Sequence, residues 1–195
     1  MSADGRVLTG FSLPYIALYS ASGTTVSYAS GQILARGVSV DLEIESAGDD
    51  NIFYANNVAA ETVAGVFNGG TATLTVDGLK AAAERLLLGL PAAGEDGFTA
   101  YGDSASIPYV GLGFVCRYMS DGQTSYVPVI LNKCRCQMPN LSANTQEEEI
   151  DWQTQELVFN VLRDDSANHT WKQVGAEQTT EAAAEAKIKT AFSIT

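Results

Sequence analysis

The chain has 195 residues, of which 46% are hydrophobic and 17% are charged, so it can build an apolar core and is not expected to be disordered. Its net charge of -12, from 23 acidic and 11 basic residues, disfavours direct binding to nucleic acid, because no basic patch in the sequence offsets it. The longest apolar run, 86–93, contains Gly89 and Pro91 and is too short to cross a bilayer.

Three cysteines, Cys116, Cys134 and Cys136, are an odd number and too few for a disulfide framework. Residues 1–6 lack the apolar stretch of a signal peptide. We therefore expect a reducing, cytoplasmic compartment in which all three thiols are free.

The first third of the chain predicts β-strands. Residues 13–19 are rich in aromatic and aliphatic side chains, and 20–31 is interpreted as a loop or a short hairpin. Residues 38–45 alternate strictly between apolar and polar side chains, which predicts a half-buried strand with one wet face. The apolar positions are Val38, Val40, Leu42 and Ile44, and the polar ones are Ser39, Asp41, Glu43 and Glu45.

The segment 61–76 has two interpretations. Asn68-Gly69-Gly70 supplies the positive φ angles of a tight turn, which favours a hairpin. The alternative is a helix over 58–67, because four apolar residues there also follow helical spacing: Ala59, Val63, Val66 and Phe67.

Two helices are expected. The first covers 78–88, with Asp77 as its N-terminal cap and with Gly89 and Pro91 ending it. Its apolar stripe consists of Leu79, Ala82, Ala83, Leu86, Leu87 and Leu90. The second helix lies in 177–192, where acidic residues come early and lysines late, as the helix dipole favours.

Residues 108–119 and 124–137 predict a second hairpin around Asp121-Gly122. Together the elements predict a mainly β fold, a β-sandwich or partly closed barrel, with one packed α-helix and a C-terminal helix. The expected core comprises Val38, Val40, Leu42, Ile44, Leu74, Val76, Leu86, Leu87 and Val129.

The remaining segments are less regular. Residues 46–57, 91–107 and 138–148 are predicted to be long loops. In 149–162 two alternating patterns are out of phase, and a bulge near Thr154 would reconcile them.

The sequence gives no pattern that favours a cofactor, a metal or catalysis. Gly111-Leu-Gly113 lacks the third glycine of a dinucleotide loop and lies in a predicted strand, where glycines mark a bulge or a close strand crossing. Cys134 and Cys136 are two apart on a strand, so both point to one face as small apolar groups. His169 is the only histidine, so neither a zinc site nor a catalytic triad is expected.

The order of four stretches carries a resemblance to a known family. They are Phe53 to Asn57, the predicted helix ending in Leu-Leu-Leu-Gly at Gly89, the segment from Gly111 to Tyr118, and the polar stretch from Thr145 to Leu157. Over about residues 10–165 this order resembles the major tail protein (tail tube protein) family of siphophages, the long-tailed bacteriophages. Asn56 and Asn57 stand where acidic residues are common in that family, and the chain after Arg163 matches none of its pattern.

The resemblance implies a single tail tube domain over 1–195, with a core of about 10–165 and a C-terminal helical extension of about 166–195. It implies a structural protein of the virion, not an enzyme, which assembles in the host cytoplasm without a membrane or a cofactor. Its subunits would form hexameric rings that stack into a tube, and DNA would pass through the lumen without specific binding. The implied partners are other copies of the chain, the tape measure protein, and the tail terminator and distal tail proteins.

The charge pattern suggests how the subunits would meet. The predicted hairpin from Gly111 to Gln137 carries Arg117, Lys133 and Arg135. The strand 38–45 carries only acids, Asp41, Glu43 and Glu45. We expect these six residues at subunit contacts, as weak and salt-sensitive pairs.

The alternative function is a β-sandwich module that binds carbohydrate or a receptor. Exposed aromatic side chains at a loop surface would favour it, because sugars stack on such rings. The candidates are Tyr101, Tyr109, Trp152 and Trp171.

Overall fold

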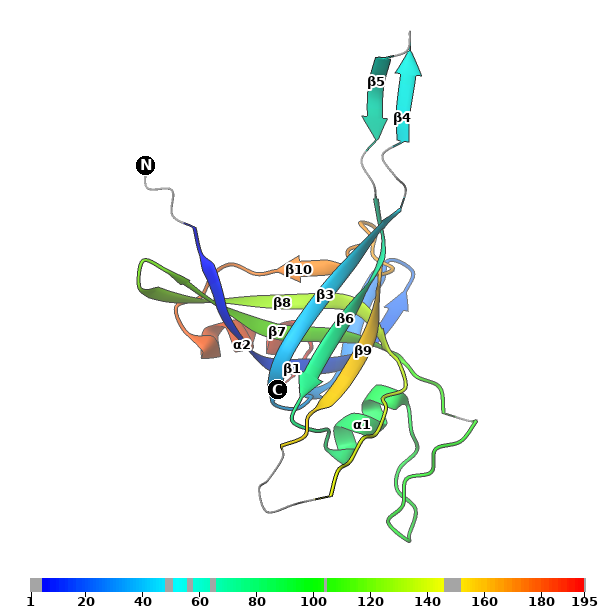
Figure 1. Cartoon of the computed structure of the whole chain (residues 1–195). Coiled ribbons are helices and arrows are strands. Elements are labelled where there is room, and N and C mark those ends of the chain that lie inside the picture. The colour runs from blue at the N-terminus through cyan, green and yellow to red at the C-terminus, as the bar shows by residue number, and fades with distance from the viewer. Residues whose placement is uncertain are drawn as a thin grey trace.

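The computed structural model describes residues 5–47, 51–55, 58–63, 66–103, 105–145 and 152–194. Within them, antiparallel strands form an eight-stranded sheet and a separate two-stranded hairpin, accompanied by two helices (Figure 1). The mainly β fold with one packed helix and a C-terminal helix is therefore confirmed.

The strands of the large sheet follow the order β2-β1-β7-β8-β9-β6-β3, and β10 pairs with β8. The strands are β1 (Val7–Ser22), β2 (Thr25–Ile33), β3 (Gly37–Ala47), β4 (Asn51–Ala55), β5 (Val58–Val63), β6 (Val66–Val76), β7 (Tyr109–Ser120), β8 (Gln123–Cys136), β9 (Gln155–Leu162) and β10 (Lys172–Val174). The helices are α1 (Ala81–Leu88) and α2 (Glu181–Ala191).

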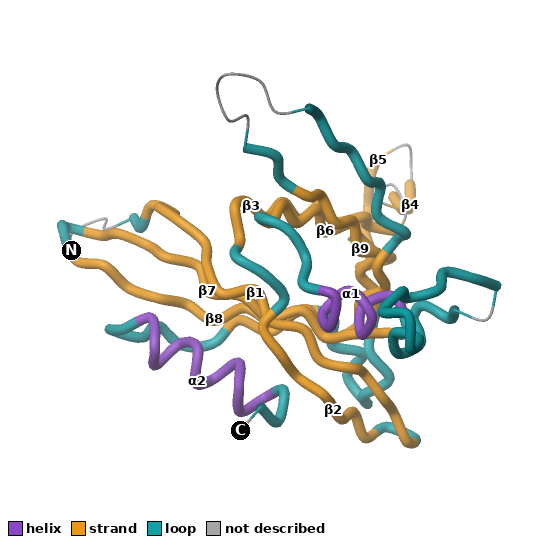
Figure 2. Tube along the Cα trace, turned by 90° about the horizontal axis from the view of Figure 1, so that it is seen from below, coloured by secondary structure: helices purple, strands orange, loops and turns teal. Residues whose placement is uncertain are grey.

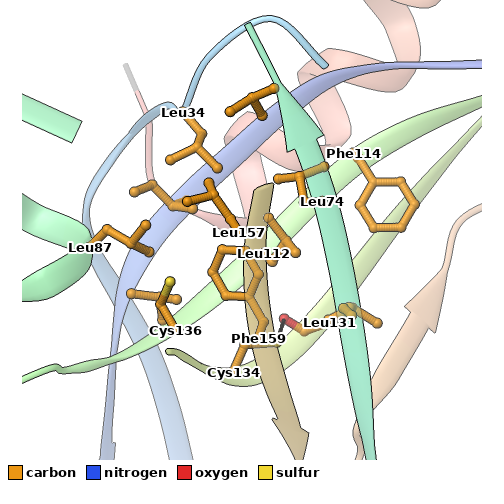
Figure 3. Close-up of a cluster of buried hydrophobic side chains, with 14 of the residues drawn as sticks. Leu34, Leu74, Leu87, Leu112, Phe114, Leu131, Cys134, Cys136, Leu157 and Phe159 are labelled. Carbon is orange, nitrogen blue, oxygen red and sulfur yellow. Dashed lines mark hydrogen bonds between the residues drawn. The ribbon is translucent and has the colours of Figure 1, made fainter. Parts of the chain in front are cut away.

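The large sheet folds over its own core. Strands β3, β6 and β9, which we call the first half-sheet, cross β1, β7 and β8 of the second half-sheet at a steep angle (Figure 1). Both half-sheets point apolar side chains inward, as Leu74 and Phe159 do from the first and Leu112 from the second (Figure 3). Helix α1 closes one end of this core with the fully buried Leu87.

The second half-sheet is covered on its outer side by α2 (Figure 2). Ile188 and Phe192 form a second apolar cluster with residues of β1, β7 and β8. A Cβ atom on Gly113 would lie 2.7 Å from Cγ2 of Ile188, and one on Gly111 would lie 2.8 Å from Cε1 of Phe192. A bulge does occur at Gly111, but the helix contact explains why both positions are glycine.

The expected core is confirmed in part. Leu74, Val76, Leu87 and Val129 are buried, and Val40, Leu42 and Leu86 are partly buried against them. The prediction was wrong for Val38 and Ile44, which are 57% and 42% exposed. Both lie on β3, which pairs on one side only within the described residues, and Val38 stands at a register shift between Gly37 and Ser39.

The predicted hairpin within 61–76 is wrong. Asn68 to Gly70 lie inside the continuous strand β6, and a Cβ atom on Gly70 would lie 2.6 Å from the backbone oxygen of Glu43. Close approach of β3 therefore explains this glycine, where the sequence had indicated a turn. The alternative helix over 58–67 is also wrong, because β5 covers Val58–Val63.

Asp77 does not cap the first helix. Its carboxylate instead accepts hydrogen bonds from the backbone N and from Nε of Arg36, at 2.9 and 2.5 Å. Helix α1 begins after Lys80, which makes no side-chain cap bond, and ends as predicted at Gly89 with φ of 64°.

Several local predictions are confirmed. Asp121 and Gly122 both have positive φ angles, 49° and 75°, at the turn between β7 and β8. The segment 20–31 belongs to the hairpin of β1 and β2, not to a loop. Helix α2 is capped by Thr180, whose hydroxyl accepts from the N–H of Ala183.

The irregular segments follow the sequence less well. Residues 51–55 of the expected loop 46–57 form strand β4, whereas the described parts of 91–107 and 138–148 contain no helix or strand. Strand β9 begins at Gln155, so no bulge near Thr154 is needed, and residues 149–151 lie outside the described part.

Candidate functional site: the polar face of the first half-sheet

The outer side of the first half-sheet is polar, and no helix in the described part of the chain covers it. Cross-strand partners lie on the same side of a sheet, so the register places Glu43, Thr71, Asn160 and Arg135 in one row. We call this surface the polar face. Its polar members on the three strands are Asp41, Glu43 and Glu45 on β3, Thr71, Thr73 and Thr75 on β6, and Glu156 and Asn160 on β9. The register also places two apolar side chains of β9 on this side, Val158 and Leu162.

One margin of the polar face is acidic. Asp41, Glu43 and Glu45 are exposed on β3, whose other edge pairs with no strand in the described residues. None of the three forms an ion pair with a residue that the structure describes. We call this margin the acidic edge.

The side of the polar face away from β3 is basic, where β8 pairs with β9 and, on its other side, with β7. Nζ of Lys133 lies 4.7 Å from the centre of the Tyr109 ring, and Cζ of Arg135 lies 5.6 Å from it. Arg163 lines the same shallow pocket, of about 360 Å³, as Tyr109 and Lys133. We call Lys133, Arg135 and Arg163 the basic corner.

The three cations of the corner differ in the hydrogen bonds and ion pairs that they form within the chain. Nζ of Lys133 donates to Oδ2 of Asp165 at 2.7 Å, and this bond lowers the pKa of Asp165. Arg163 donates to the backbone oxygen of Phe67. Arg135 is exposed and has no carboxylate partner among the described residues. Arg135 and Arg163 therefore offer the free donors of the corner.

Tyr19 binds the same carboxylate as Lys133. The Tyr19 hydroxyl donates to Oδ2 of Asp165 at 2.7 Å. Burial raises the pKa of Tyr19 to about 12, so the phenol stays protonated and neutral at physiological pH. Lys133 also lies 5.1 Å from the Tyr19 ring centre.

A buried polar network fixes the loop that carries Asp165. Asn132 and Asp164 are only 3% and 4% exposed. Nδ2 of Asn132 donates to Oδ2 of Asp164 at 2.7 Å, and Oγ of Ser166 donates to Oδ1 at 2.6 Å. Nε2 of Gln173 donates to Oδ1 of Asn132 at 2.8 Å. Because every polar group here has a partner, the network can hold the basic corner in place.

The structure separates the basic residues that the sequence had grouped. Lys133 and Arg135 lie together at the corner. Arg117 lies on β7 opposite Tyr126, eight residues beyond Tyr109 and so about 26 Å away along the strand. Sequence reasoning missed Arg163, because it follows the predicted strand and only the tertiary fold brings it to Tyr109.

The aromatic candidates for ligand binding are scattered. Trp152 and Tyr101 are 84% and 55% exposed. Trp171 is stacked on Phe67 at 4.5 Å between ring centres, so one of its faces is covered. Tyr109 belongs to the basic corner.

The cysteines lie away from this face. Cys116, Cys134 and Cys136 are buried free thiols, and the latter two point into the core as predicted (Figure 3). Burial raises the pKa of Cys136 to about 12, which keeps the thiol protonated and unreactive. In the described part of the chain, no three histidine, cysteine or acidic side chains come together as a metal site would require.

The hairpin of β4 and β5 extends the first half-sheet beyond the core (Figure 1). We call strands β4 and β5 the arm. Its strands pair with each other and belong to a sheet of their own.

Comparison with known proteins adds no family. No protein-family model matches this sequence, and no curated protein is significantly similar to it. Among the described residues, neither helix is long and apolar enough to span a membrane.

Proposed function

We propose that this protein is the structural subunit of a phage tail tube, which assembles into hexameric rings that stack into a conduit for DNA delivery. The observation that carries the proposal is the bare polar face, which ends in an unpaired edge strand and continues into an arm separate from the main sheet. These features provide surfaces for self-association, and no described cluster provides groups for catalysis.

The edge strand is a strong reason to expect self-association. β3 is 11 residues long, and one row of its backbone N–H and C=O groups has no strand partner in the part of the chain that the structure describes. It contains no proline, and its Val38 and Ile44 side chains are exposed. A long edge of this kind promotes pairing with another chain, and ring closure satisfies it without aggregation.

The polar face suits the wall of a channel. Threonine and asparagine side chains bind water, and the acidic edge repels phosphate at short range. A hexamer would carry six times -12, a net charge of -72. DNA would therefore slide past such a wall without being gripped.

The arm gives a contact for stacking. A two-stranded hairpin alone is marginally stable in water, so it gains stability when it packs on another surface. In a stack of rings, that surface would be a copy of the chain in the neighbouring ring. The resemblance to tail tube proteins supplies the further proposed partners, namely the tape measure, terminator and distal tail proteins.

Electron microscopy of the purified chain tests the proposal. At high concentration, negative-stain images should show rings or tubes, and light scattering should show masses well above that of a monomer. Protein that stays monomeric and dispersed at every concentration would contradict a tube and favour a monomeric binding module.

An arm deletion sharpens this test. Ala47 and Val66 pair directly, so an Asn-Gly turn can join them in place of residues 48–65. The shortened chain should keep its circular dichroism spectrum but stop forming tubes. A matched control, Gly102→Ala, changes an open site with no atom within 4 Å and should assemble normally.

A further inference from the structure

We infer that the basic corner is the receptor for the acidic edge of a second copy of the same chain. The inference rests on the proposed function, because it names the joint between neighbouring subunits of one ring. Three arguments support it: the placement of the acidic edge and the basic corner, the availability of their charged groups, and the supply of matching carboxylates by the chain itself.

The placement of the margins favours a head-to-tail contact. Glu43 and Arg135 lie in the same cross-strand row, with Glu43 at its end on β3 and Arg135 further along it, where the row continues to Tyr109 of β7. Three strand spacings separate them, or about 14 Å, so they cannot pair within one subunit. Strand β8 pairs with β7 and β9 on its two sides, so a second copy cannot add a strand there. It can instead dock on the polar face, so that the side chains of its acidic edge meet those of the basic corner. The same contact repeated around an axis closes a ring.

The charged groups of the two surfaces are complementary and available. Asp41, Glu43 and Glu45 form no ion pair with a described residue, and neither does Arg135. Lys133 is already paired with Asp165, whereas Arg135 and Arg163 present free guanidinium N–H groups. A guanidinium binds a carboxylate through two parallel hydrogen bonds, which gives such a joint a defined geometry.

The chain itself supplies the carboxylates that suit the corner. Phosphate of nucleic acid would also suit two guanidinium groups. The net charge of -12 opposes both partners, because a second copy carries the same charge. The acidic edge presents three exposed carboxylates without ion-pair partners among the described residues, so their local attraction to the corner offsets this repulsion.

Two complementary variants test the joint. The corner variant is Arg135→Glu with Arg163→Glu, and the edge variant is Glu43→Lys with Glu45→Lys. Each alone places like charges at every contact, so the concentration needed for assembly should rise roughly tenfold at low salt. An equimolar mixture restores opposite charges at each joint, so assembly should return to within roughly twofold of the original chain. Light scattering and analytical ultracentrifugation measure both.

Arg117→Glu is the matched control, because it reverses an exposed arginine on β7 far from the corner. Either variant assembling as well as this control would overturn the inference, as would a mixture that stays unassembled while both variants are folded. Because Arg163 also bonds to Phe67, Arg135→Glu alone replaces the double variant if the latter unfolds.

The two proposals fail in different ways. If the original chain forms no rings or tubes, the tail tube function is wrong. The mixed variants still measure the joint in that case, because their complex is visible by mass even as a dimer. If rings form and charge reversal at the corner has no more effect than the control, only the joint is wrong.

Discussion

The two outer sides of the folded sheet differ in composition and in what covers them. On the second half-sheet, Val115 and Ile130 point outward and pack under Ile188 of α2 and Phe192 at its C-terminal end. On the first half-sheet, threonines and acids occupy the equivalent outer positions, and β3 ends the sheet without a further strand. An aliphatic sheet surface needs cover from its own chain, whereas a hydrated one can stay bare and serve as a contact or a channel wall.

The largest loss of stability should come from a substitution on the second half-sheet, which α2 covers. Phe192 is fully buried against the second half-sheet, so Phe192→Ala should lower the free energy of unfolding by about 3–5 kcal/mol. Urea unfolding followed by circular dichroism measures this loss. Lys187→Ala, on the exposed side of the same helix, is the control. Equal stability of the two variants would mean that α2 adds little to the fold.

The next largest loss of stability should come from Gly113, which packs against α2. A methyl group at position 113 would collide with Ile188, so Gly113→Ala should cost about 1–3 kcal/mol in overpacking. Gly102→Ala, in open space, should be close to neutral in the same urea titration. A neutral Gly113→Ala would show that the helix moves aside without cost.

The buried network tests whether the basic corner needs a rigid support. Asp164→Ala leaves the Asn132 amide and the Ser166 hydroxyl without their partner, which should cost about 1–3 kcal/mol. Asp165→Ala removes an exposed carboxylate one position away and should cost less. The comparison would be contradicted if Asp165→Ala were the more damaging change in thermal unfolding.

The attachment of α2 should weaken in acid. A hydrogen bond from Lys189, together with one from Tyr15, lowers the pKa of Glu185 below its ordinary value. A lowered folded pKa stabilises the protein above the unfolded pKa of about 4.3, and that stability is lost as the pH falls through the folded pKa.

Urea midpoints measured from neutral to acidic pH check this sign. The stability difference between the original chain and Glu185→Gln should be full near neutral pH and shrink as the solution becomes more acidic than the unfolded pKa. A difference that grows on acidification would contradict the assigned bond.

The smallest change in stability should come from a substitution on the polar face of the first half-sheet. Thr73 is half-buried in the middle of the polar face and supports no core residue, so Thr73→Val should change stability by no more than about 0.5 kcal/mol. A loss above about 1 kcal/mol in urea unfolding would mean that the polar face contributes to folding as the covered side does.

The sequence by itself determined features that depend on neighbours along the chain. Asp121-Gly122 predicted the turn of the β7–β8 hairpin because few residues adopt two successive positive φ angles. Alternation in 38–45 placed Asp41, Glu43 and Glu45 on one face, since side chains of a strand point alternately to its two sides. The charge pattern of 177–192 likewise predicted α2.

Only the tertiary structure decided features that depend on which segments become neighbours in space. Val38 and Ile44 are exposed because β3 became an edge, and Gly70 is required by the backbone of Glu43. Lys133 and its partner Asp165 are 32 residues apart, and Arg163 reaches the corner through the fold. A local pattern fixes the face to which a side chain points, whereas burial and pairing depend on long-range packing that spacing along the chain does not encode.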